Sequence, residues 1–263
     1  MQAIARKEGI HVIVIKCGGS VLHELSPSFF TSVQQLRNSG LDVVIVHGGG
    51  PDIGQLLHAL HIPSEFVNGL RKTTKDVLDV VEMVLNGKVN KTLVSLLQAN
   101  DIRAVGLSGV DDRLLQAKPI DVQTLGYVGE VVHVHANLVH TLLRQGYVPV
   151  IAPIGMDEHG QTYNINADTA AAAIAQALSA DKLVFVTDVA GILNDGEVVK
   201  EATAHMIEAM IANGTISGGM IPKVKAALRA LNSVNEVAIV SGKVPFYKEG
   251  TWHGTMMKKE VYV

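Results

Sequence analysis

Two lysines next to glycine pairs are the residues of this chain best placed to do chemistry. Lys16 ends the apolar run VIVIK just before one glycine pair. Lys223 follows another, Gly218-Gly219, in the first turn of a helix that the apolar spacing of segment 217–231 predicts to begin near this pair. A cation at this end of a helix is disfavoured by about 0.3–1 kcal/mol. A bound polyanion would reverse that penalty, so the pattern favours phosphate; a solvated surface is the alternative.

Two glycine loops follow predicted strands and could direct backbone N–H groups at an anion. They are Gly18-Gly19 and Gly48-Gly49-Gly50, and Pro51 then opens a helix that would point its positive end into the same space. Each loop could instead be only a tight turn between strand and helix. The second loop could also be a loose dinucleotide fingerprint, but its spacing is GxGxxxG and it follows the second strand. No GxxxxGK[ST] motif is present, which excludes a P-loop nucleotide hydrolase.

An acid, Asp168, lies at the start of an alanine-rich helix predicted over 167–178. Asn166 can cap this helix, and an acid in the first turn interacts well with the helix dipole. Capping alone could explain Asp168. Alternatively, its carboxylate could hold the ammonium groups of both Lys16 and Lys223.

Short apolar runs predict the elements that must position these residues. Continuous Val/Ile-rich runs are typical of parallel strands covered on both faces, and segments with helical spacing lie between most of them. The sequence therefore predicts an α/β fold, a three-layer αβα sandwich around a mainly parallel central sheet. The strands are expected at 11–16, 42–47, 103–108, 147–154, 182–188 and 236–241, and the helices at 28–37, 51–60, 167–178, 203–212 and 217–231.

Three further features concern organisation. Residues 120–135 alternate and carry glycines, which predicts an antiparallel excursion. Thr73 with Asp76 fits a capping box at the start of another helix. A boundary near 179–181 would divide a single domain, 1–263, into an N-terminal lobe, 1–180, and a C-terminal lobe, 181–263.

Composition excludes several classes of protein. Of 263 residues, 48% are hydrophobic and 18% charged, with a net charge of −3, which is typical of a globular chain without a nucleic-acid or membrane footprint. One cysteine, Cys17, excludes a disulfide framework and favours a cytoplasmic location. No apolar run approaches the roughly 20 residues that span a bilayer.

Other reactive side chains have simpler explanations. His133, His135 and His140 could suggest a metal site. The simpler explanation is an exposed polar face of the antiparallel ribbon, which His133 and His135 would share. Cys17 is expected to be a small buried side chain. Asp111-Asp112 is expected to lie in a polar turn, and His47 to make a structural hydrogen bond.

Motifs in a fixed order over nearly the whole chain resemble the amino acid kinase family, in particular its members that phosphorylate N-acetyl-L-glutamate. They are IKCGGS, VHGGGP, NGLR, GLSG, NINAD, TDVAGI, SGGMIPKV and the late pair Gly254-Thr255. The resemblance implies transfer of a phosphoryl group from ATP to the side-chain carboxylate of the substrate, in the second step of arginine synthesis. That carboxylate is already ionised at pH 7, so no general base is needed.

The resemblance also implies roles for matching residues. Lys16 and Lys223 would stabilise the transition state, Asp168 would orient both, and the N–H groups of Gly19 and Gly49 would face the phosphoryl group. The acetylglutamate site would comprise Gly49, Gly50, Arg71 and Asn164. The nucleotide site would comprise Asp188, Val189, Ala190, Gly191, Ile192, Leu193, Thr215, Ile216 and Ser217.

The remaining expectations concern cofactors and assembly. Mg²⁺ would arrive with ATP, so no protein ligand to a metal is predicted. The N-terminal lobe would bind acetylglutamate and dimerise, and the C-terminal lobe would bind ATP. Arginine-inhibited members of the family carry an extra N-terminal helix that mediates ring assembly. Only about ten residues precede the first strand here, so the resemblance implies an arginine-insensitive homodimer. Alternatives are a family member with another carboxylate or phosphate acceptor, a dinucleotide-dependent oxidoreductase, and a non-catalytic nucleotide sensor.

Overall fold

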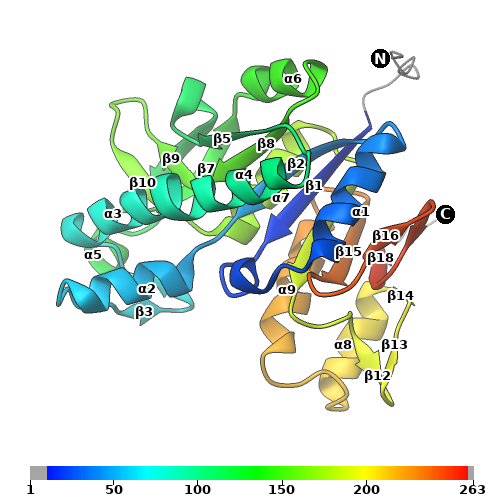
Figure 1. Cartoon of the computed structure of the whole chain (residues 1–263). Helices are drawn as coiled ribbons and strands as arrows, with labels where there is room; N and C mark the ends of the chain where they lie inside the picture. Colours follow the sequence, from blue (N-terminus) through cyan, green and yellow to red (C-terminus); the bar gives the residue numbers. More distant parts are fainter. Residues whose placement is uncertain (1–10, 260–263) are drawn as a thin grey trace.

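A computed structural model describes residues 11–259, and an eight-stranded sheet forms its centre (Figure 1). The strand order is β14-β18-β15-β11-β1-β2-β8-β5, and every pair is parallel except β15–β18. All six predicted strands are present in this sheet. They are β1 (Val12–Cys17), β2 (Asp42–His47), β5 (Ala104–Ser108), β8 (Val148–Ala152), β11 (Lys182–Thr187) and β15 (Glu236–Ser241), to which β14 (Glu201–Ala202) and β18 (Thr255–Lys258) are added.

Helices cover both faces of the sheet, which confirms the three-layer αβα sandwich. Along β1, Val12 and Val14 enter one core cluster while Ile13 and Ile15 enter the other, because successive side chains point to opposite faces. The first cluster contains α6 (Asn137–Arg144), α7 (Ala167–Ala177), α8 (Ala204–Ala212) and α9 (Met220–Ala230). The second contains α1 (Pro27–Asn38), α4 (Asn90–Ala99) and the hairpin of β16 (Tyr247–Lys248) and β17 (Thr251–Trp252).

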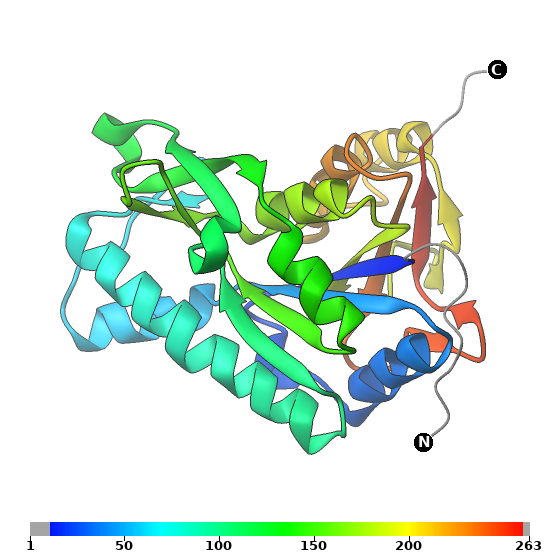
Figure 2. The same ribbon diagram turned by 90° about the horizontal axis from the view of Figure 1, so that it is seen from above.

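A third core cluster lies under the remaining long helices and supports the second glycine loop. It joins α2 (Gly50–Ala59), α3 (Lys75–Glu82) and the π-helical segment η2 (Met83–Val89). α3, η2 and α4 follow one another without interruption as a single rod along one side of the molecule (Figure 2). The cap of α3 is Thr74, whose hydroxyl accepts from the N–H of Val77, so the assignment of the cap to Thr73 was wrong by one residue.

The antiparallel excursion is present, but its strands differ from the prediction. β6 (Leu115–Pro119) pairs antiparallel with β7 (Val128–Val134), and the short helix α5 (Val122–Leu125) separates them. The predicted strand 147–154 divides at Pro153, because β9 (Ile154–Met156) leaves the central sheet. β9, β6, β7 and β10 (Thr162–Ile165) close into a small barrel.

Short elements complete the chain. None of the helices in residues 11–259 is long and apolar enough to cross a membrane. The short elements are β3 (Phe66–Val67), β4 (Leu70–Arg71), β12 (Leu193–Asn194), β13 (Glu197–Val198) and the 3₁₀ segments η1 (Leu22–Glu24) and η3 (Asp111–Arg113).

Candidate active site

The two glycine loops meet at one edge of the sheet. β1 and β2 are parallel neighbours with Cys17 opposite His47, so the loops that follow them emerge side by side. A Cβ added to Gly19 would lie 2.8 Å from the backbone nitrogens of both Gly49 and Gly50. No side chain fits there. The sequence therefore needs glycine at this point for a close approach of two backbones.

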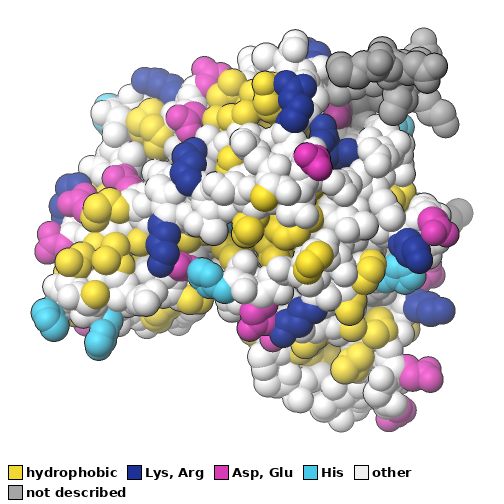
Figure 3. All heavy atoms as spheres, viewed as in Figure 1, with side chains coloured by type: hydrophobic (Ala, Val, Ile, Leu, Met, Phe, Trp, Pro, Cys, Tyr) yellow, Lys and Arg dark blue, Asp and Glu magenta, His cyan; other side chains and the backbone are white. Residues whose placement is uncertain are grey.

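A pocket of about 160 Å³ opens beside this contact. Its wall includes the second glycine loop, the hairpin of β3 and β4, and the turn before α7. The outline of the molecule is indented between the part that carries α2 and β3 and the part that carries α8 (Figure 3). The lining residues are Gly48, Gly49, Gly50, Ile53, Phe66, Gly69, Leu70, Arg71, Leu85, Val128, Pro153, Asn164, Ile165, Asn166 and Ala167.

Lys16 and Asp168 lie together, as predicted. The Lys16 Nζ is 2.8 Å from Oδ1 of Asp168. Asn166 caps α7 by accepting from the N–H of Asp168 at 2.9 Å, which fixes the start of the helix and the position of the acid. A Cβ on Gly18 would lie 3.6 Å from the same ammonium, so Lys16 turns back towards the first glycine loop.

Lys223 has a different partner in this structure. Its ammonium pairs with the carboxylate of Asp188, which directly follows β11, and not with Asp168. The hydrogen bond from Lys223 is the main cause that lowers the pKa of Asp188. Since β11 pairs in parallel with β1, Asp188 and Lys16 emerge at the same edge of the sheet. Of the predicted interactions of Asp168, the structure therefore contains only the one with Lys16.

Arg71 lies in the wall of the pocket and meets only neutral groups of the described residues. It donates to the hydroxyl of Ser64 and to the carbonyl of Gly50, at 3.1 Å for the latter, and stacks 4.6 Å from the ring centre of Phe66. Burial lowers the pKa of this guanidinium, which stays charged at neutral pH. A positive charge without an acid partner at a pocket wall can bind an anionic ligand.

Asn164 is held near Arg71 by a residue whose role the sequence did not indicate. Thr73 is fully buried; its hydroxyl donates to the carbonyl of Arg71 at 2.8 Å and accepts from Nδ2 of Asn164 at 3.1 Å. The amide oxygen of Asn164 is thereby oriented by a fixed partner on its nitrogen. Thr73 thus connects two residues predicted to bind substrate.

His47 is structural, as predicted. It is fully buried, and burial is the main cause that lowers its pKa to about 4, so the ring is neutral at pH 7. Its Nδ1 donates to the carbonyl of Gly48 at 3.0 Å, and its Nε2 accepts from Nδ2 of Asn90 at 3.1 Å. Asn90 was missed, although its position three residues before Leu93 and seven before Leu97 places it on the buried face of α4.

The residues predicted to bind the nucleotide divide into two groups. Ile192 and Ile216 are buried in the core, so their side chains support the site instead of lining it. Thr255 is fully buried and its hydroxyl accepts from the N–H of Ile192 at 2.8 Å, which gives the late Gly254-Thr255 pair a structural role. The exposed members of the predicted set are Asp188, Ala190, Leu193, Thr215 and Ser217. Val189 and Gly191 are its remaining members and are not among the exposed ones.

Cys17, Asp111 and the pair His133 and His135 lie in the surroundings expected of them. Burial raises the pKa of the Cys17 thiol to about 12, which makes it a poor nucleophile. Asp111 accepts from the N–H and hydroxyl of Ser108 in a polar turn. The exposed rings of His133 and His135 lie 4.4 Å apart. Within residues 11–259, no cluster of three or more His, Cys, Asp or Glu side chains could hold a metal ion.

Comparison with known proteins gives concordant results. Residues 11–241 match the model of the amino acid kinase family. The chain is 65% identical to the acetylglutamate kinase of Geobacillus stearothermophilus over 95% of this chain and 98% of that protein, and 52% identical to that of Halalkalibacterium halodurans over 95% and 97%.

Solved structures support the same assignment at the level of the fold. The protein smu.665 from Streptococcus mutans superposes with a TM-score of 0.81 at 33% identity, covering 94% of this chain and 98% of that one. The carbamate kinase of Giardia, at 16% identity and a TM-score of 0.68 over 96% and 100%, shares the fold alone. These matches give no support to a dinucleotide-dependent oxidoreductase. The chain belongs to the amino acid kinase family.

Proposed function

We propose that this chain transfers the γ-phosphoryl group of ATP to the side-chain carboxylate of N-acetyl-L-glutamate, forming an acyl phosphate. The observation that carries the proposal is the pocket beside the joined glycine loops, with the ammonium of Lys16 at the first loop. The guanidinium of Arg71 lies in the pocket wall and has no acid partner within residues 11–259. The two relatives described above, both acetylglutamate kinases, favour this acceptor over others used in the family.

Each group has a role in this reaction. The carboxylate oxygen attacks the γ-phosphorus while the bond to the β-phosphate oxygen breaks, and ADP leaves with that electron pair. The N–H groups of Gly19 and Gly49 and the ammonium groups of Lys16 and Lys223 face the charge on the moving phosphoryl group. Asp168 orients Lys16. To take part in the reaction, Lys223 has to leave its ion pair with Asp188 and bind the phosphate instead.

The substrates bind on opposite sides of this transfer point. Arg71 binds the α-carboxylate, and Gly49, Gly50 and Asn164 hold the rest of acetylglutamate within 1–180. The exposed residues around Asp188 and Thr215 hold the nucleotide within 181–263. Magnesium that arrives with ATP would neutralise phosphate charge when bound.

A coupled assay of ADP release with acetylglutamate as acceptor tests the proposal. We expect turnover with ATP and acetylglutamate, and trapping of the product by hydroxylamine as a hydroxamate, which is specific for an acyl phosphate. Turnover only with free glutamate, aspartate, carbamate or UMP would assign the chain to another activity of the same family. ATP binding without transfer to any of these acceptors would indicate a sensor.

Replacing Arg71 with glutamine should raise the KM for acetylglutamate about 10- to 100-fold with little change in kcat, because a charge-assisted hydrogen bond contributes about 1.5–3 kcal/mol. The KM of the Arg71→Lys variant should lie between those of the wild type and Arg71→Gln, since lysine keeps the positive charge but lacks the planar guanidinium that makes paired hydrogen bonds. Steady-state kinetics with varied acetylglutamate measure this. Arg103→Gln is the matched control, because Arg103 also stacks on an aromatic ring, 4.2 Å from the centre of Tyr147. If Arg71→Gln and Arg103→Gln had the same KM for acetylglutamate, Arg71 would not be a residue that binds the substrate.

We also propose that the chain forms a homodimer through the β5 edge of the sheet. The strand order ends at β5, whose outer edge pairs with no other strand of residues 11–259, and an unpaired strand edge can pair with a second copy. Beside it, the rod of η2 and α4 exposes the apolar side chains of Met83 and Leu96. Light scattering during gel filtration should give twice the 28.0 kDa mass of the chain. A monomer mass would contradict the proposal.

A further inference from the structure

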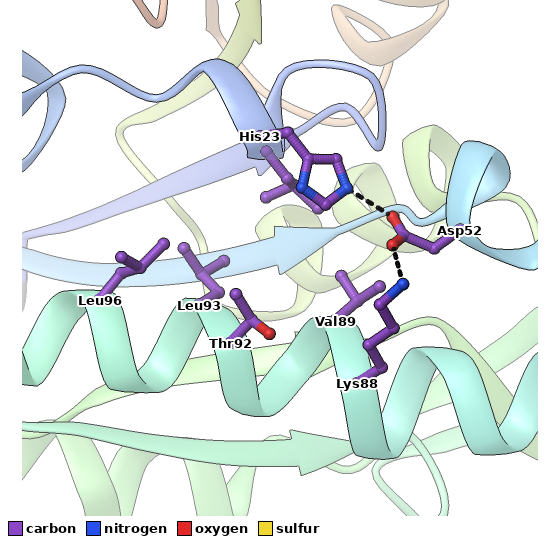
Figure 4. Close-up of a pocket in the computed structure, with 8 residues that line it drawn as sticks. His23, Asp52, Lys88, Val89, Thr92, Leu93 and Leu96 are labelled. Carbon is purple, nitrogen blue, oxygen red and sulfur yellow. Dashed lines mark hydrogen bonds and ion pairs between the residues drawn. The ribbon is translucent and has the colours of Figure 1, made fainter.

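Asp52 is a buried carboxylate that the proposed transfer does not use directly. It lies in the first turn of α2, two residues after Gly50, and only 3% of its side chain is exposed. Both oxygens are engaged: Oδ1 is 2.9 Å from Nζ of Lys88, and Oδ2 is 2.9 Å from Nε2 of His23. In Figure 4 the carboxylate lies between the imidazole of His23 and the ammonium of Lys88, above the helix that carries Lys88.

The two partners come from segments that adjoin the two glycine loops. His23 belongs to η1, and this segment continues the turn in which the N–H of Val21 donates to the carbonyl of Gly18 at 3.0 Å. Lys88 belongs to the π-helical segment η2. The carboxylate thus connects the structure behind the first loop, the start of α2 after the second loop, and η2.

The π-helical segment also contacts the second loop directly. A Cβ added to Gly49 would lie 2.6 Å from Cδ2 of Leu85 and 3.2 Å from Cγ2 of Val89. Lys88 lies between these two residues in sequence, so the same turn of η2 packs on the loop and binds Asp52. π-helical turns are rare and are often found at functional sites.

A favourable interaction with the dipole of α2 is the simplest explanation of an acid at this position. It does not explain why the acid is buried or why side chains from two other segments, Lys88 and His23, meet it. Burial by itself raises the pKa of Asp52, but the hydrogen bonds from Lys88 and His23 outweigh it and hold the pKa below its ordinary value. The group therefore stays charged at neutral pH and retains both partners.

We propose that Asp52 is a positioning residue for phosphoryl transfer: held by Lys88 and His23, it fixes the separation of the two glycine loops. The inference rests on the proposed function. The backbone N–H groups of Gly19 and Gly49 have to face one phosphoryl group from two separate loops. A displacement of about 1 Å in such a site can cost roughly 100-fold in rate.

The test is a set of charge-removing variants measured by the acetylglutamate-dependent release of ADP. Asp52→Asn should lower kcat about 10- to 100-fold while the KM values for acetylglutamate and ATP stay nearly unchanged. Lys88→Met should lower kcat in the same way, and Lys88→Arg should restore it. The double variant Asp52→Asn with Lys88→Met should show no further loss, because both changes break one network.

A matched control separates this network from surface charge in general. Lys75 forms an exposed ion pair with Asp79 on α3, and Lys75→Met should leave kcat unchanged. If Asp52→Asn does not fold, the more than half-exposed Lys88 and His23 decide the question through Lys88→Met and His23→Gln. Wild-type turnover with an unchanged kcat in the variants overturns this inference alone, as does a loss confined to KM. Absence of wild-type turnover overturns the proposed function itself.

Discussion

Replacing Lys16 with methionine should lower kcat about 100- to 1,000-fold. This is the usual loss when one preorganised donor to a developing charge is removed. The ammonium lies beside the first glycine loop and is already oriented by Asp168 at 2.8 Å, so no reorganisation is needed when the phosphoryl group moves. Methionine keeps the length and apolar part of the side chain. Single-turnover measurement of ADP formation after an acid quench isolates the chemical step from product release.

The Lys16→Met variant also leaves Asp168 without its cation, and the carboxylate could then repel ATP. Combining Lys16→Met with Asp168→Asn removes that repulsion. If the ammonium itself stabilises the transition state, the double variant stays slow while its affinity for ATP recovers. Recovery of kcat in the double variant would instead show that Lys16 only neutralises Asp168. Lys118→Met is the matched control, because Lys118 forms an exposed pair with Glu130 at 3.1 Å.

The two proposed catalytic lysines differ in whether the structure pairs them with Asp168, the acid proposed to orient both. Lys16 has its predicted partner, whereas Lys223 is bound to Asp188 at the end of the neighbouring strand. A triphosphate entering between them would compete with Asp188 for the ammonium of Lys223. Nucleotide binding and placement of the second lysine are therefore expected to be coupled, and the carboxylate of Asp188 keeps Lys223 at the correct edge of the sheet until then.

Local patterns in the sequence were sufficient for six of the eight strands of the central sheet and for the residues at the ends of these six, but not for β14 and β18. Val/Ile runs fix β1 and β2, and the carboxyl ends of parallel strands necessarily share an edge, so Lys16 and the glycine loops had to be neighbours. Asn166 was recognisable because capping depends on residues only two or three positions away. These parts of the site follow from short-range rules.

The remaining parts depend on contacts between distant segments, which no local pattern encodes. Asp52 resembles any acid in a first helical turn, and only the fold brings His23 and Lys88 to it. Thr73 was assigned to a helix cap because threonine suits that position, but Thr74 caps the helix and Thr73 connects Arg71 with Asn164. For Asn90 a signal existed: a polar residue in register with buried leucines has to find hydrogen-bond partners.

Replacing Gly19 with alanine should lower kcat at least 100-fold and destabilise the fold. The added Cβ would lie 2.8 Å from the nitrogens of Gly49 and Gly50 and 2.9 Å from Cα of Gly49. These are backbone atoms, which cannot rotate away as a side chain can, so the two loops must separate. The N–H groups that we propose face the phosphoryl group would then no longer converge, and a shift of about 1 Å suffices for a roughly 100-fold loss.

Gly87→Ala is the matched control for this prediction, since a Cβ on Gly87 in η2 would meet no neighbouring segment within 4 Å. Both variants add one methyl group, so a difference between them reports the contact of the loops and not the loss of glycine. Turnover and thermal unfolding should both distinguish the pair, with Gly87→Ala close to the wild type. If Gly19→Ala retained the wild-type kcat, the two loops could not form one phosphoryl site, and the assignment of Gly19 and Gly49 would have to be abandoned.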